Sequence, residues 1–127
     1  MGESLFLLDS NICIYALAGR SDSLKLRLTA QPAGSLAISS ISLAEVGVRY
    51  GETVETDAGL RAFLRQVEVL PFDEAAARIY AKLLFRRGSF DRLIAAHAVS
   101  LGRILVTNNE RDFADIPGLR LENWIRA

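Results

Sequence analysis

Acidic residues stand close to apolar segments that are typical of buried β-strands. Asp9 directly follows the run Leu5–Leu8, and Asp112 lies just beyond a second run, Ile104–Thr107. In an open parallel sheet, the side chains beyond the carboxyl ends of the strands line the ligand crevice. We therefore expect one edge of a sheet to gather the candidate catalytic residues, which are Asp9, Glu45, Asp91 and Asp112.

Carboxylates that converge repel one another unless a cation offsets their charge. The chain has one histidine and one cysteine, so such a cluster would lack the ligands that zinc prefers. Mg²⁺ binds one or two carboxylates, several waters and the oxygens of a substrate phosphate. The residues thus predict Mg²⁺-dependent phosphoryl chemistry, with candidate metal ligands Asp9, Glu45, Asp91 and Asn109. Asn109 and Asp112 remain alternatives for the fourth position.

The acidic residues also have purely structural explanations. Asp9 can cap a helix that begins at Ser10. Glu45 follows Ser42 with the spacing of a capping box, and Asp91 can complement the dipole of a helix that begins beside it. Spacing alone leaves both explanations open for each residue.

Two further residues are of types that often take part in catalysis, but their sequence neighbours are typical of residues packed in a core. His97 lies between alanines, which favours a packed helical residue over a general base. Cys13 is the only cysteine, so it cannot form an internal disulfide, and it is expected to be buried on an apolar helix in a reducing compartment.

Strand and helix signals alternate along the chain, which predicts an α/β sandwich around a largely parallel sheet. Strands are expected at 5–8, 36–38, 67–70, 104–107 and 119–122. Helices are expected at about 10–19, 21–30, 42–50, 60–67, 73–88 and 91–102, and the boundary between the fourth helix and the strand at 67–70 stays open.

The bulk composition predicts one folded domain spanning residues 1–127, because 50% of the residues are hydrophobic. Lys+Arg and Asp+Glu both number 15, so no global basic field exists to hold a polyanion. No signal-type segment and no run of roughly 20 apolar residues is present, so we expect a cytoplasmic protein without membrane contact.

Several short motifs occur in order and together resemble one known family. They are Leu7–Asn11, Ser39–Tyr50, Phe90–His97, Leu105–Asn109, Asp112–Phe113, Ile116–Leu119 and Glu122–Trp124. This series is similar to the PIN-domain ribonuclease toxins of the VapC/FitB type, and the similarity covers nearly the whole chain.

The resemblance implies a PIN-like three-layer α/β/α sandwich with a mostly parallel, four- to five-stranded sheet. It also implies an Mg²⁺- or Mn²⁺-dependent endoribonuclease that cleaves structured RNA such as tRNA. A VapB/FitA-like antitoxin would neutralise the enzyme with a C-terminal segment that wraps near the active site. The expected assembly is a homodimer, or a heterotetramer or larger complex with antitoxin, that contacts operator DNA only through the antitoxin.

The family's acidic positions fall on Asp9, Glu45 and Asp91, while its fourth position is Asn109, which carries no charge. Asp112, one helical turn on, is the alternative. The connection before Asp91 is also shorter than in relatives, which puts the reach of Asp91 into the site in question. A catalytically inactive PIN-like scaffold is therefore the alternative function.

Other polar side chains are candidate RNA contacts. The positions next to the acidic residues and strand ends are Ser10, Asn11 and Thr107. The candidate cations for the RNA backbone are Arg49, Lys82, Arg86, Arg87 and Arg92. A phosphatase of the haloacid-dehalogenase type is disfavoured because it needs an acid where Asn11 stands.

Overall fold

The computed structural model of the chain describes residues 5–83 and 89–125. Its strands form one five-stranded sheet in the order β3-β2-β1-β4-β5, and all neighbouring pairs are parallel. Their bounds are β1 Phe6–Leu8, β2 Leu36–Ser39, β3 Glu68–Leu70, β4 Ile104–Val106 and β5 Leu121–Glu122. The parallel α/β sheet expected from the alternating strand and helix signals is confirmed.

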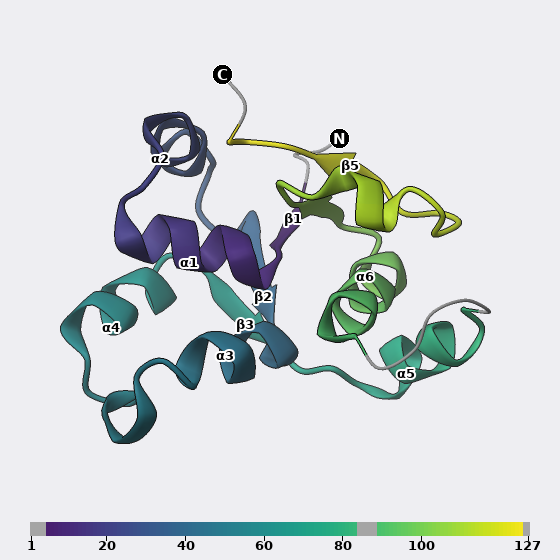
Figure 1. Cartoon of the computed structure of the whole chain (residues 1–127), viewed down its shortest axis with the longest axis horizontal. Helices are drawn as coiled ribbons and strands as arrows, with labels where there is room; N and C mark the ends of the chain where they lie inside the picture. The colour runs from purple at the N-terminus through teal and green to yellow at the C-terminus, as the bar shows by residue number, and fades with distance from the viewer. Residues whose placement is uncertain (1–4, 84–88, 126–127) are drawn as a thin grey trace.

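Helices cover both faces of the sheet, which gives the expected three layers. Figure 1 shows α1 to α4 on one side of the strands and α5 and α6 on the other. The helices are α1 Ser10–Ala18, α2 Asp22–Thr29, α3 Ser40–Gly47, α4 Ala58–Leu64, α5 Glu74–Ala81 and α6 Phe90–Leu101, with short 3₁₀ helices η1 Gly51–Thr53 and η2 Glu110–Phe113.

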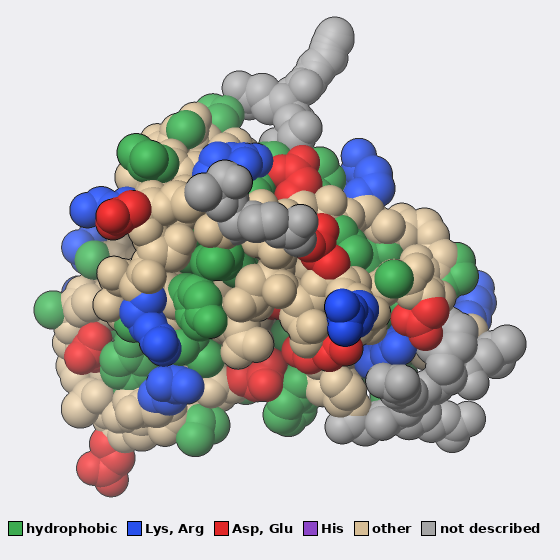
Figure 2. Space-filling model, turned by 45° about the horizontal axis from the view of Figure 1, so that its top comes forward, with side chains coloured by type: hydrophobic (Ala, Val, Ile, Leu, Met, Phe, Trp, Pro, Cys, Tyr) green, Lys and Arg blue, Asp and Glu red, His purple; other side chains and the backbone are tan. Residues whose placement is uncertain are grey.

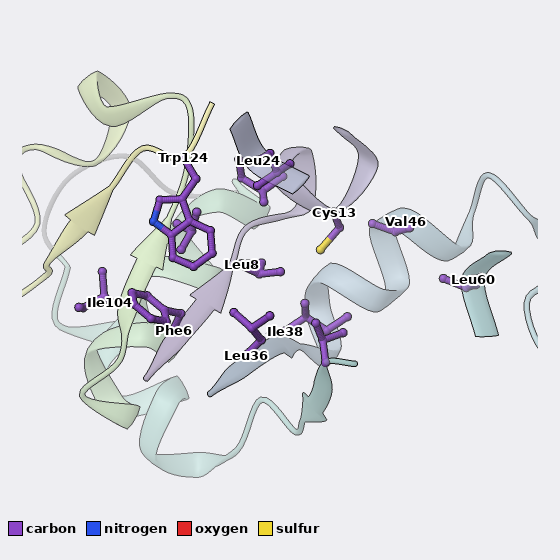
Figure 3. Packing of buried hydrophobic residues seen from close by; sticks show 13 residues of the cluster. Phe6, Leu8, Cys13, Leu24, Leu36, Ile38, Val46, Leu60, Ile104 and Trp124 are labelled. Atoms are coloured by element: carbon purple, nitrogen blue, oxygen red, sulfur yellow. The ribbon is translucent and has the colours of Figure 1, made fainter. Parts of the chain in front are cut away.

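The alternation of side chains along each strand divides the core into two parts. Phe6 and Leu8 point to the side of α1 to α4, where Trp124 packs edge-on against Phe6 with ring centroids 4.8 Å apart (Figure 3). Leu7 points to the opposite side and packs with buried residues of α6, including Ile94 and Ala98. Burial on both faces explains why β1 reads as a continuous apolar run.

The strand register brings the carboxyl ends of the central strands to one level. Leu8 of β1 lies opposite both Ile38 of β2 and Val106 of β4. The backbone N–H of Asp9 also donates to the carbonyl of Val106 at 3.0 Å. The residues that directly follow β1, β2 and β4 are therefore brought together at one edge of the sheet.

The capping-box prediction at Ser42 is wrong. α3 begins at Ser40, and its N-cap is Ser39, whose hydroxyl accepts from the N–H of Ile41. The earlier start follows from β2, which ends at Ser39 and leaves no room for a separate loop. Ser42 and Glu45 consequently lie inside the helix, where their side chains are available for other contacts.

Two predicted helix ends also differ from the structure. The helix expected to reach Tyr50 ends at Gly47, and a turn and η1 follow it. α5 is capped by Asp73 as expected, but it ends at Ala81 with Lys82 as its C-cap, so the helix is shorter than predicted. Residues 86–88, where the predicted helix ends, lie outside the described residues. Along 5–83 and 89–125, no helix combines the length and the apolar character needed to cross a membrane.

Candidate active site

Asp9 lies at the junction between β1 and α1 and has two roles. Its Oδ1 accepts from the N–H of Ile12 at 2.9 Å, so it caps α1 as its structural explanation predicts. The side chain is only 3% exposed, and it also receives a hydrogen bond from Thr107. Asp9 is therefore a buried carboxyl held from two sides.

Burial raises the pKa of Asp9 to about 6, against the opposing effect of the hydrogen bonds from Thr107 and the Ile12 backbone. The negative charges of Asp91 and Glu45 raise this pKa further. Both charges act on Asp9, which favours a place for Glu45 and Asp91 on the same side of the sheet as Asp9. The convergence of all three carboxyls on one site stays a prediction.

Glu45 reaches the site from α3, one helical turn beyond Ser42. Its Oε1 accepts from the Ser10 hydroxyl at 2.5 Å, and Ser10 Oγ lies 3.2 Å from Ser42 Oγ. Glu45 itself is half-buried, whereas both serines are buried. This burial favours a structural contact for Ser10 over the substrate contact that we expected.

Asp91 occupies the first turn of α6, which is capped by Ser89. Burial raises its pKa, and the charge of Asp112 raises it further. The charge of Asp91 also raises the pKa of Asp9, which favours a place for Asp91 near the site despite the short connection before it. Residues 84–88 of that connection lie outside the described part of the chain.

Asn109 and Asp112 lie together beyond β4. The Asn109 side-chain amide donates to Oδ2 of Asp112 at 2.5 Å, and its backbone N–H donates to Thr107 Oγ1 at 3.0 Å. Asp112 is the member of this pair whose charge acts on Asp91. The contacts favour Asp112 as the fourth acid and Asn109 as the residue that holds it, and both are exposed.

The donor set at this edge fits a hard divalent ion. Within the described residues, no three acidic, histidine or cysteine side chains are close enough to form a complete metal cluster. The electrostatic effects act instead between pairs of carboxyls. Glu45 and Asp91 each act on Asp9, and Asp112 acts on Asp91. One or two carboxylates are what Mg²⁺ takes from a protein when waters and substrate fill its other positions.

The two packing predictions are confirmed. His97 is 1% exposed; its Nδ1 lies 2.9 Å from Ser39 Oγ, and its ring packs edge-on against Phe72. Burial lowers its pKa, so the imidazole is neutral at pH 7. Cys13 is fully buried, and burial raises the pKa of its thiol far above the usual range. A general-base His97 and a reactive Cys13 are both disfavoured.

The candidate RNA-binding cations differ in their exposure. Arg92 is 5% exposed, and its guanidinium contacts both carboxylate oxygens of Asp115 at 3.1 Å, which favours a structural role. Arg49 and Lys82 are exposed. Arg86 and Arg87 lie outside the described residues.

Sequence reasoning missed Arg111. It is exposed and lines a shallow cleft of about 540 Å³ beside the acidic site, together with Asn108, Asn109, Glu110 and Ala114. Its position just beyond a central strand was the available signal. On the face shown in Figure 2, basic and acidic side chains are interspersed.

Comparisons with known proteins agree with this arrangement. The PIN domain family matches residues 6–119. The chain is 38% identical to the tRNA(fMet)-specific endonuclease VapC of Shigella flexneri, over 94% of this chain and 97% of that protein. It is 34% identical to the protein of the same name from Salmonella typhimurium, with the same coverage.

Solved structures show the same similarity. A VapBC2 structure from Rickettsia felis, bound to a promoter DNA fragment, matches with a TM-score of 0.76 at 34% identity, covering 94% of this chain and 98% of that one. A DNA-bound VapBC structure from Salmonella typhimurium matches with a TM-score of 0.77 at 32% identity, covering 96% and 99%. The chain therefore belongs to the PIN-domain family and, within it, to the VapC ribonucleases.

Proposed function

We propose that this protein is a divalent-metal-dependent endoribonuclease that hydrolyses phosphodiester bonds in structured RNA, with transfer RNA as the substrate class. The observation that carries the proposal is the buried carboxyl of Asp9 at the end of β1, with Glu45 held at the start of α1 by its hydrogen bond from Ser10. The names of the Shigella and Salmonella relatives support the choice of transfer RNA.

The acidic residues would have different roles according to their positions. Asp9 and Asp91 would hold the ion, Mg²⁺ or Mn²⁺, with Glu45 and Asp112 at its sides. A bound ion there supplies an activated water and stabilises charge on the phosphate. Asp9 must lose its proton before it can bind a cation, and its pKa of about 6 allows this at neutral pH.

Arg111 and Asn11 would contact the substrate. Both are exposed, and Arg111 lines the cleft next to Asp112. A guanidinium there can bind an RNA phosphate while the acidic residues act on the scissile bond.

We also propose an antitoxin partner and an assembly larger than one chain. The support comes from the VapBC structures of Rickettsia felis and Salmonella typhimurium. Size-exclusion chromatography with light scattering, on the chain alone and with its antitoxin, measures the assembly. A monomer in both samples would contradict this part of the proposal.

The activity is tested with purified wild type and Asp9→Asn, incubated with transfer RNA and ribosomal RNA in Mg²⁺, Mn²⁺ or EDTA. We expect metal-dependent cleavage of transfer RNA that falls at least about 1,000-fold in the variant, because a neutral amide cannot replace the buried carboxylate. Asp57→Asn, at the cap of α4, is the matched control and should cleave normally.

Equal inertness of folded, metal-supplied wild type and Asp9→Asn would contradict the nuclease and favour the inactive scaffold. Cleavage that persists in EDTA would contradict the metal requirement alone.

A further inference from the structure

A chain of two buried serine hydroxyls leads to Glu45. Ser10 Oγ lies 2.5 Å from Glu45 Oε1 and 3.2 Å from Ser42 Oγ. Ser10 is 5% exposed and Ser42 is 0% exposed, so neither hydroxyl can exchange its partners for bulk water. The three side chains link α1, which begins at Ser10 directly after Asp9, to α3, which carries Glu45.

The direction of these hydrogen bonds follows from the number of protons. A hydroxyl has one proton to donate, and an ionised carboxylate can only accept. Ser10 therefore donates to Glu45 and accepts from Ser42. Ser42 is free for this contact because Ser39, not Ser42, caps α3.

We propose that Ser10 and Ser42 are positioning residues that fix the Glu45 carboxylate relative to Asp9. This inference rests on the proposed function for its role in catalysis. Without the Ser10 hydroxyl, Glu45 would lose the short bond that holds one of its oxygens and would sample other rotamers. Ser42 acts indirectly, because its hydrogen bond orients the hydroxyl of Ser10.

Ser10→Thr and Ser10→Val form a matched pair, because the two side chains have nearly the same shape and differ in the hydroxyl. We expect the Mn²⁺ affinity of Ser10→Val, measured by titration calorimetry, to be about 10- to 100-fold weaker than that of Ser10→Thr. Ser35→Ala is the control, since Ser35 is also buried but lies before β2, at the other end of the sheet, and should leave Mn²⁺ affinity unchanged.

A second measurement needs no metal and no activity. In EDTA, Ser10→Val should lower the melting temperature relative to Ser10→Thr, and this difference should shrink in a Glu45→Ala background, where only the contact with Ser42 remains. An undiminished difference without Glu45 would overturn the hydrogen bond from Ser10 to Glu45. Equal Mn²⁺ affinity of the folded Thr and Val variants would overturn the positioning role.

These outcomes differ from a failure of the proposed function. Wild type that binds Mn²⁺ and shows the coupling, yet cuts no RNA, would contradict the nuclease while supporting the serine chain. Wild type that binds no Mn²⁺ would overturn the positioning of a metal ligand.

Discussion

At the scale of single residues, the site contains a carboxyl group whose burial lowers folding stability but which can take part in catalysis. Asp9 illustrates this, because it is a good helix cap and at the same time a carboxyl that burial makes difficult to ionise. Its Oδ1 bond to the Ile12 N–H and its bond from Thr107 offset only part of that cost. An anionic group kept at such a place is typical of a functional site.

Asp9→Asn should stabilise the metal-free protein at neutral pH. The native pKa of about 6 lies above the usual value of 3.8 for an aspartate, so between those values the native state binds more protons than the unfolded state and stability falls as pH rises. The full difference corresponds to about 3 kcal/mol as an upper limit. Urea unfolding in EDTA should show the variant more stable at pH 7.5, with the difference shrinking as pH falls toward about 4.

The control for this prediction is Asp57→Asn, which changes a helix cap outside the acidic site. It should show a smaller, less pH-dependent change. If Asp9→Asn were destabilised equally at both pH values, the burial of an ionised Asp9 would not be a cost to the fold.

At the scale of elements, the ends of strands and the first turns of helices position the functional side chains. β1 runs directly into α1 at Asp9, and β2 runs directly into α3, so neither junction contains a flexible loop. Asp91 depends instead on the first turn of α6. There the Ser89 hydroxyl accepts from the N–H of Asp91 at 3.1 Å.

Ser89→Ala should therefore lower both stability and activity. The loss of an N-cap costs about 1 kcal/mol, and a misplaced catalytic group can cost up to about 100-fold in rate. Asp73→Ala removes the cap of α5 and is the matched control, because its loss should cost similar stability without lowering the rate. Urea unfolding and RNA cleavage measure the two effects. Equal cleavage by both folded variants would show that the α6 cap does not position Asp91.

At the scale of the whole molecule, equal numbers of acidic and basic residues leave no net field to attract RNA. Affinity must then come from a few local contacts and from the bound cation. The cleft beside η2 offers one such contact through Arg111.

Arg111→Ala should weaken RNA binding and reduce its salt dependence. In the Asp9→Asn background, where cleavage is blocked, the slope of log K against log salt should fall by about 0.7 to 0.9 for one lost phosphate contact. Arg65→Ala removes the same charge from a groove lined by α4 and should leave the slope unchanged. Fluorescence anisotropy with labelled transfer RNA measures both, and an unchanged slope for Arg111→Ala would place the RNA elsewhere.

Local signals in the chain were sufficient for the fold class and for most elements. Continuous apolar runs predicted the buried strands, and Asp9, Asp73 and Gly102 predicted helix ends that the structure contains. These features depend on neighbours within a few residues, so the sequence contains their physical cause. The acidic residues could be proposed for the same reason, since each lies close to a strand or helix end.

Contacts between distant segments could not be predicted in this way. Ser42 has the spacing of a cap, yet the end of β2 gives that role to Ser39 and leaves Ser42 beside Ser10, 32 residues away. The choice between Asn109 and Asp112 likewise depends on how η2 approaches α6. Such contacts arise when separate elements pack against one sheet, and no local pattern in either segment encodes the other's position.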